Sequence, residues 1–218
     1  RVVVITDANI DRLYHPLVER FEHIIIGSGE TNKTLQTVEN IYRQLMAMGA
    51  DRSTFLLGIG GGIVTDITGF VAATYMRGVE FGFVSTTLLG AVDASVGGKN
   101  GVSVAQYKNM VGTFLQRRCV ITDVAMLRTL PEREWRAGLA EVVKAAVIGD
   151  SELFGLLERS ADSLRHTPEL LHDVVVRAIR LKADIVERDE REGGVRRVLN
   201  LGHTLGHAIE KSTQRYNH

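Results

Sequence analysis

The sequence predicts an α/β domain with a doubly wound, Rossmann-like sheet, followed by an all-α region. Two observations predict the first part. Short apolar runs alternate with helix-like segments, which is typical of a parallel sheet covered by helices. One of these runs, residues 55–59, leads into a cluster of glycines at Gly58, Gly60, Gly61 and Gly62. The second part is predicted because glycine disappears between residues 155 and 193, where helical patterns dominate.

In chain order, strands are predicted at residues 2–5, 23–26, 55–59, 79–85 and 120–122, and helices at residues 11–21, 31–48 and 64–76. The helix at residues 31–48 has apolar side chains three or four residues apart, as on one buried face: Leu35, Val38, Ile41, Tyr42 and Leu45. Gly49 is its predicted C-cap. Residues 86–109 are rich in glycine and polar side chains, and no helix or strand is assigned there.

Beyond Pro131, helices are predicted at residues 132–148, 151–160, 168–187 and 205–211. Pro131 and Pro168 fit the first positions of two of them. We therefore place a domain boundary within residues 123–130, with an α/β domain at residues 1–125 and a helical domain at residues 126–218. The missing initial Met and an end inside a motif lead us to expect a piece of a longer chain, incomplete at its C-terminus.

Composition excludes several classes of protein. The 218 residues include 26 basic and 26 acidic side chains, a balance that gives no reason to expect nucleic acid or a membrane as partner. No apolar run approaches the length of a membrane span. The single cysteine, Cys119, fits a reducing compartment, and no signal peptide is visible, so we expect a cytoplasmic protein.

The glycine cluster predicts a phosphate site. A strand, a glycine turn and a helix together open space for a phosphate at the helix N-terminus. The dinucleotide motif G-x-G-x-x-G would place glycine at position 63, where the chain has Ile63. On the glycines alone, a tight turn without a ligand remains an alternative. Polar residues that follow, among them Asp66, Asp93 and Lys108, favour a site.

Two pairs of residues in the helical half are also candidate functional residues. Glu141 and Lys144 share one face of a helix that is apolar nearly all round, and a buried acid needs a partner or a metal. His203 and His207 are four residues apart, a spacing that can bind zinc and that is more often structural.

Six motifs, in order, resemble those of the 3-dehydroquinate synthases, which are sugar-phosphate cyclases. They are GGGIVTDITGF, YMRG, STTLLGAVDASVGGK, YKNMVGTF, LRTLPEREWRAGLAEVVK and LNLGHTLGHAIE. The resemblance implies cyclisation of 3-deoxy-D-arabino-heptulosonate 7-phosphate to 3-dehydroquinate with loss of phosphate, in the shikimate pathway. It also implies NAD, one divalent metal (zinc, with cobalt as the alternative), a small phosphorylated sugar-acid substrate and a homodimer.

The resemblance assigns residues to these roles. The implied NAD-binding residues are Glu30, Lys33, Gly61, Gly62, Asp66, Thr86, Thr87, Lys99, Lys108 and Thr129. The implied metal ligands are Glu141, His203 and His218. The implied catalytic and substrate-binding residues are Arg77, Asp93, Lys99, Asn109, Lys144, Lys182, Arg196, Asn200 and His207.

The chain departs from the family pattern at Ser85, Gly90–Ala91, Asn100, Ser103 and Arg117. Because residues 90–103 are expected beside the substrate, related cyclases remain alternatives: 2-deoxy-scyllo-inosose synthase and 2-epi-5-epi-valiolone synthase. The intact sequence DASVGGK favours a dehydroquinate synthase. Two further alternatives are a metal-dependent polyol dehydrogenase and a non-catalytic NAD-binding fragment.

Overall fold

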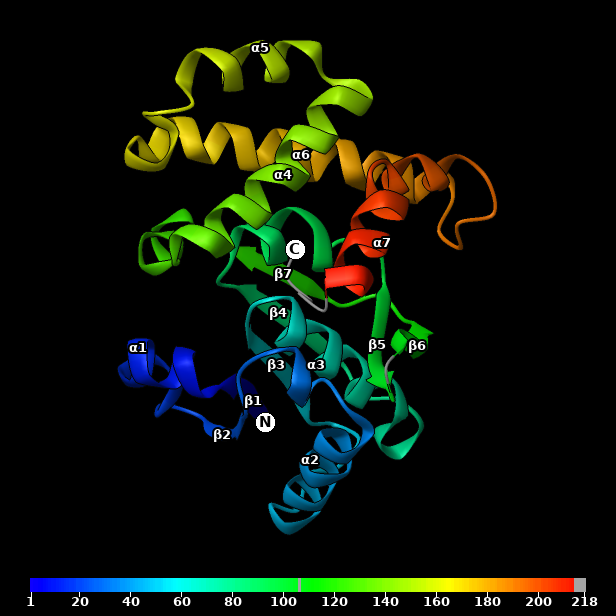
Figure 1. Cartoon of the computed structure of the whole chain (residues 1–218). Coiled ribbons are helices and arrows are strands. Elements are labelled where there is room, and N and C mark those ends of the chain that lie inside the picture. Colours follow the sequence, from blue (N-terminus) through cyan, green and yellow to red (C-terminus); the bar gives the residue numbers. More distant parts are fainter. Residues whose placement is uncertain (106, 214–218) are drawn as a thin grey trace.

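A five-stranded parallel sheet forms the first half of the molecule (Figure 1). The computed structural model describes residues 1–105 and 107–213. Along the sheet the order is β2 (Glu22–Ile26), β1 (Val2–Asp7), β3 (Phe55–Gly60), β4 (Phe81–Ser85) and β7 (Cys119–Thr122). All four neighbouring pairs are parallel, so the predicted α/β class is confirmed.

Helices cover both faces of this sheet. Successive side chains of a strand point to opposite faces. In β1, Val3 and Ile5 accordingly join the core beneath α2 (Leu35–Ala47) and α3 (Gly62–Thr74). Val4 instead packs in a separate cluster with Ile10 of α1 (Ala8–Val18). This is the doubly wound arrangement that the sequence predicts.

Two predicted helix starts are wrong by several residues, and capping side chains explain the difference. The Asp7 carboxylate accepts hydrogen bonds from the backbone N–H groups of Asn9 and Ile10 at 2.8 and 3.1 Å, so α1 begins at Ala8 rather than at residue 11. Thr34 caps α2 through the backbone N–H of Thr37. The residues before Thr34 form a separate 3-10 turn, η1 (Glu30–Asn32).

Residues 86–109 contain regular structure that the sequence did not predict. A π-helical turn, η3 (Gly90–Ala94), is followed by an antiparallel hairpin of β5 (Lys99–Val104) and β6 (Tyr107–Phe114). The hairpin packs on α3, and its Val102 is fully buried. This segment is therefore a fixed part of the fold, with η3 packed against α3, α4 and α6 and the hairpin packed against α3.

The second half is helical, as predicted, and lies along one side of the sheet (Figure 1). Its elements are η4 (Val124–Thr129), α4 (Glu132–Gly149), α5 (Ser151–Ser160), η5 (Leu164–His166), α6 (Pro168–Arg188), η6 (Val195–Asn200) and α7 (His203–Thr213). Leu88, Ala91 and Val92 belong to its core, so the residues around η3 join the two halves. The division at residues 125 and 126 stays a prediction. Among the helices described, none is long and apolar enough to cross a membrane.

Candidate functional site

The glycine turn after β3 leaves the N-terminus of α3 open. Gly61 precedes the helix and supplies no side-chain cap. A Cβ on Gly60 would lie 2.5 Å from Cγ2 of Val64, and one on Gly61 would lie 2.9 Å from Cγ2 of Thr87. Side chains are thus excluded from the turn, and backbone N–H groups at the helix start remain available to an anion.

Thr86 adds a hydroxyl beside this turn. It follows β4 and is tied to the turn because its backbone N–H donates to the carbonyl of Gly60 at 3.0 Å. Its side chain is buried, and within the described part of the chain its Oγ1 has no hydrogen-bond partner. A buried hydroxyl without a partner is costly, so a ligand oxygen at this place would satisfy it. These residues fit the phosphate groups of a dinucleotide.

A buried ion pair lies further along α3. The Nζ atom of Lys33 donates to Oδ2 of Asp66 and to Oδ1 of Asn109, both at 2.5 Å. Burial raises the pKa of the Asp66 carboxyl, and the Lys33 ammonium group opposes this effect. Nearby, the Ser103 hydroxyl donates to Glu30 at 3.2 Å. The structure therefore brings together Glu30, Lys33, Asp66 and Asn109, four residues that the resemblance placed in the site.

A second charged cluster surrounds Asp93 in η3. Lys182 of α6 forms an ion pair with the Asp93 carboxylate and also donates to the Asp93 carbonyl at 2.8 Å. Lys144 of α4 lies 3.9 Å from the same carboxylate and pairs with Glu141. Three elements that are distant in sequence thus bring two cations and two carboxylates together.

The charges of this cluster depend on one another. Burial alone would raise the pKa of Asp93, but Lys182 and Lys144 hold that pKa below its ordinary value. Burial lowers the pKa of Lys182, and the Asp93 carboxylate opposes this change. Asp93 is consequently an anion that keeps two ammonium groups in place, and these can meet an anionic or hydroxyl-bearing ligand.

Glu141 and His203 fit a divalent metal. The Glu141 side chain is 15% exposed, and its Oε2 forms the ion pair with Lys144 without a well-aligned hydrogen bond. His203 begins α7 and lies close enough to Asp93 to help lower its pKa. Among the described residues no group of three metal-binding side chains occurs, and the predicted third ligand, His218, lies outside them. A carboxylate and an imidazole are donors that zinc accepts.

Three further predicted residues lie around the loop that carries Glu192. Lys99 begins β5 and forms an ion pair with Glu192, which also accepts from Nδ2 of Asn200 at 2.5 Å. The Arg196 side chain is buried and donates to the carbonyls of Gly97, at 3.0 Å, and Glu190. Lys99, Arg196 and Asn200 are therefore neighbours, as a shared substrate site requires.

The structure leaves some predicted residues apart from this group. Arg77 is exposed in η2 (Tyr75–Arg77), beyond the C-terminal end of α3, whereas Asp66 lies near the start of that helix. Thr129 instead faces α1, where its Oγ1 lies 2.9 Å from the Tyr14 hydroxyl. Lys108 lies on β6 next to Asn109. The His207 side chain lies outside the described part of the structure.

Sequence reasoning missed Glu192 altogether. It belongs to an acidic loop and precedes Gly193 and Gly194. Paired glycines predict a tight turn, but they do not predict a contact with a residue distant in the sequence. Ser103, whose backbone N–H donates to the Lys33 carbonyl at 2.8 Å, was noticed only as a departure from the family pattern. Both residues connect the hairpin to the site.

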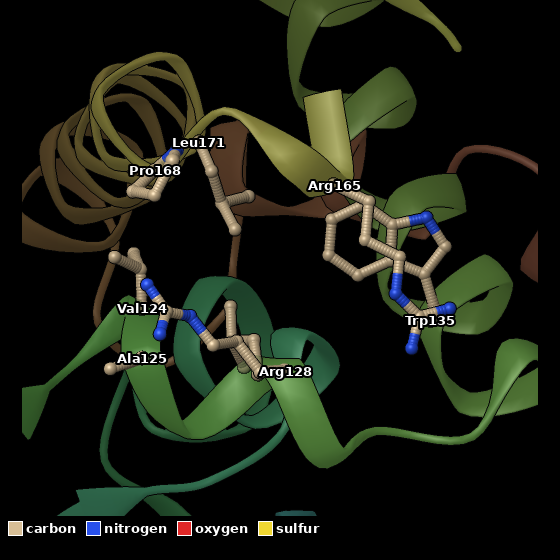
Figure 2. Close-up of a pocket in the computed structure, with 8 residues that line it drawn as sticks. Val124, Ala125, Arg128, Trp135, Arg165, Pro168 and Leu171 are labelled. Carbon is tan, nitrogen blue, oxygen red and sulfur yellow. The ribbon is translucent and has the colours of Figure 1, made fainter. Parts of the chain in front are cut away.

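A separate pocket lies between η4, α4 and α6 (Figure 2). Arg165 lies over the Trp135 ring, with its guanidinium carbon 5.3 Å from the ring centroid, and it also pairs with Glu132. None of the residues that line this pocket was predicted as a site residue: Val124, Ala125, Leu127, Arg128, Trp135, Arg165, Pro168 and Leu171. We assign it no role in the chemistry.

The fold and this site define the class of sugar-phosphate cyclases. The 2-epi-5-epi-valiolone synthase of Streptomyces hygroscopicus, solved with NAD⁺ and Zn²⁺, superposes with a TM-score of 0.91 at 31% identity, over 99% of this chain and 63% of that one. A 2-deoxy-scyllo-inosose synthase, solved with carbaglucose-6-phosphate, NAD⁺ and Co²⁺, gives 0.86 at 28% identity, over 100% of this chain and 62% of that one. A glycerol dehydrogenase from Schizosaccharomyces pombe, at 15% identity and 0.59, covers 84% of this chain and 53% of its own, and shares only the fold.

Within that class, the chain belongs to the 3-dehydroquinate synthase family. The model of the family's N-terminal part matches residues 23–137, and that of its C-terminal part matches residues 138–218. A 3-dehydroquinate synthase of Dehalococcoides mccartyi (strain ATCC BAA-2266 / KCTC 15142 / 195) is 46% identical over 98% of this chain and 62% of its own length. One from Synechocystis is 48% identical over 89% and 55%. The chain thus spans less than two thirds of the relatives that it matches.

Proposed function

We propose that the protein containing this chain converts 3-deoxy-D-arabino-heptulosonate 7-phosphate to 3-dehydroquinate and phosphate. The observation that carries the proposal is the cluster of Asp93, Lys144, Lys182 and Glu141 beside the open turn at Gly61, in a chain of this family. Such a site provides cations for a phosphorylated acid next to a place for a dinucleotide.

The cofactors supply the reactivity. When bound, NAD would supply hydride transfer, and the metal would supply polarisation of the substrate hydroxyls. Gly61, Gly62 and Thr86 would hold the dinucleotide phosphates, with Asp66 one turn into α3 and Lys33 paired with it. Glu141, His203 and His218 would hold the metal.

The protein's own residues bind and align the substrate. Lys144 and Lys182, fixed by Asp93, place positive charge where an anion or an oxygen atom is to be held. Arg196 supplies directed donors for the carboxylate, and Lys99 and Asn200 supply a charge and an amide donor for the phosphate. No side chain stands out as a general base in the described part of the chain. We therefore assign proton acceptance to the leaving phosphate of the substrate.

The cellular setting follows from this function. We propose that the protein acts in the cytoplasm, in the shikimate pathway, as a homodimer. Arg77, which lies apart from the cluster, keeps its predicted role in substrate binding as a proposal.

Turnover by the full-length protein tests the proposal. We expect phosphate release from the heptulosonate phosphate with NAD, loss of that release with chelator, and no net accumulation of NADH. Stoichiometric NADH would instead assign the protein to the metal-dependent polyol dehydrogenases, and NAD binding without turnover would indicate a non-catalytic protein. The departures at residues 90–103 keep the related cyclases as a second candidate, which turnover of another sugar phosphate in place of the heptulosonate phosphate would reveal.

A further inference from the structure

The loop between α6 and η6 is built around Asp189. Its carboxylate accepts hydrogen bonds from the backbone N–H groups of Gly193, Gly194 and Arg196, at 2.8, 2.7 and 3.0 Å. These bonds hold the pKa of Asp189 below its ordinary value. The loop is therefore an ordered turn, and it presents Glu192 in a defined direction.

Glu192 has an unusual backbone. Its φ angle is 61°, in the left-handed region that non-glycine residues rarely adopt. Two glycines follow it, and either would take this conformation more easily. Strain of this kind persists where surrounding contacts enforce it, and it gathers at functional sites. The contacts of the Glu192 side chain give a reason for this backbone conformation.

Both carboxylate oxygens of Glu192 are engaged, each by a residue of the proposed substrate site. Oε2 pairs with the ammonium group of Lys99, and Oε1 accepts from Asn200 at 2.5 Å. Burial alone would raise the pKa of Glu192, but these two donors hold it below its ordinary value. The carboxylate is thus a charged bridge between β5 and η6.

The loop joins the hairpin to the helical half at further points. Arg196 donates to the carbonyl of Gly97 at 3.0 Å, and Gln116 donates to the Glu190 carboxylate at 2.7 Å. The Lys99 side chain remains 50% exposed while the Glu192 side chain is 20% exposed. The ammonium group is therefore anchored on one side and open to a ligand on the other.

We propose that Glu192 is a positioning residue, whose carboxylate holds the Lys99 ammonium group beside the Asn200 amide so that both meet one anionic group of the substrate. This inference rests on the proposed function. An ordinary surface ion pair is a poorer account, because such a pair gains little and needs no strained backbone.

Kinetics of the full-length protein, loaded with NAD and metal, test the role. We expect E192Q to lower kcat/KM for the heptulosonate phosphate at least tenfold and E192D to recover part of that loss, with metal content unchanged. E190Q is the matched control, because Glu190 belongs to the same loop and its carboxylate bonds Gln116. K99M/E192Q should be no more than twofold slower than K99M, since Glu192 acts through Lys99. Wild-type kinetics in E192Q, or an undiminished effect of E192Q on top of K99M, would overturn the proposal.

A second measurement needs no turnover. Acetylation of Lys99 by an N-hydroxysuccinimide ester, followed by mass spectrometry and normalised to the other lysines, should be at least threefold faster in E192Q and unchanged in E190Q. An unchanged rate in E192Q would show that Glu192 does not hold Lys99. If the wild-type protein released no phosphate, the proposed function would fail, and the acetylation rates would still decide this contact.

Discussion

Lys182 reaches Asp93 across 89 positions of the sequence and binds it twice, through the carboxylate and through the main-chain carbonyl at 2.8 Å. The contact joins α6 to η3, and so the helical half to the segment that follows the sheet. Both side chains are largely buried, at 11% and 29% exposure. The fold and the proposed substrate site therefore share one ion pair.

The first prediction concerns this pair. Lys182→Met removes one partner of the buried ion pair, so that the Asp93 carboxylate keeps Lys144 as its neighbouring cation. Removing one partner of such a pair lowers the free energy of unfolding by about 3 kcal/mol. Urea unfolding should show that loss at pH 7. D93N/K182M should be less destabilised than the sum of its single variants, because no uncompensated charge remains. Strict additivity of the two substitutions would mean that the contact contributes nothing.

Lys144 provides the second prediction. Its side chain is 10% exposed and lies between Glu141 and Asp93, so it faces the cluster rather than solvent. Lys144→Met keeps the apolar stem and removes the charge. Losing one charge-assisted contact should cost roughly 1.5–3 kcal/mol, or about ten- to a hundredfold in kcat/KM. Arg136→Met on the same helix is a matched control, since Arg136 is exposed and should change kcat/KM by less than twofold. Wild-type kinetics in K144M would return Lys144 to a structural role.

The third prediction concerns the metal. His203→Ala should abolish both metal retention and activity, because it removes one of the three proposed ligands. His207→Ala should retain the metal and impair turnover. Metal content measured by mass spectrometry separates the two variants. Equal metal loss in both would show that the ligands have been chosen wrongly.

Much of the fold could be predicted because its signals are local. The strand runs, the glycine turn after β3 and the shared face of Glu141 and Lys144 depend on spacing alone. The β5–β6 hairpin could not be predicted in this way. Gly101 pairs with Gly112 across the hairpin, and a Cβ on Gly101 would lie 2.8 Å from the Val111 carbonyl oxygen. Close approach of the two strands therefore requires the glycines that make the segment resemble a loop.

The motifs could assign residues to the candidate site, but they could not show which of those residues meet. Asp93 and Lys182 were each expected in the site, but no spacing indicated that they touch. Ser85 stands where the family usually has proline, and the structure supplies a reason that the sequence could not. Its buried hydroxyl lies 2.8 Å from that of Ser95, and this bond joins the end of β4 to the end of η3.

Asp150 provides a prediction on pH. It caps α5 through the backbone N–H of Leu153 at 2.9 Å and binds Arg177 through both oxygens, at 2.6 and 2.9 Å. The Arg177 hydrogen bonds hold the pKa of Asp150 below its ordinary value. The charged carboxylate therefore stabilises the fold above its unfolded-state pKa of about 3.9, and that stability is lost as pH falls through the folded-state pKa.

Asp150→Asn retains a capping oxygen and loses the charge, so it should destabilise the protein by about 1–2 kcal/mol at pH 7. The difference from wild type should shrink as the pH falls below about 4. Glu152→Gln is the control: Glu152 is 88% exposed and 3.5 Å from Arg177, and it should change stability by less than about 0.5 kcal/mol. Thermal unfolding across pH measures both. A gap between wild type and D150N that stays constant down to pH 2 would contradict the ion-pair account.

Gly138 sets the distance between α4 and the residues that lead into η3. A Cβ at this position would lie 2.5 Å from Cβ of Leu88 and 2.6 Å from the backbone nitrogen of Leu89. Because Leu88 is fully buried, neither atom can move freely. Gly138→Ala should therefore push the two elements apart, at a cost of about 1–3 kcal/mol.

This substitution should also reduce activity, because α4 carries Glu141 and Lys144 while the segment after Leu88 carries Asp93. We expect kcat/KM to fall in G138A even where the protein remains folded. Gly155→Ala is the matched control on α5: its Cβ would meet only the flexible end of Arg159, at 3.1 Å, and replacing a helical glycine by alanine contributes up to about 1 kcal/mol. Urea unfolding and steady-state kinetics of both variants decide the matter. If G138A were as stable and as active as G155A, the close packing of α4 on Leu88 would not be what places Lys144 beside Asp93.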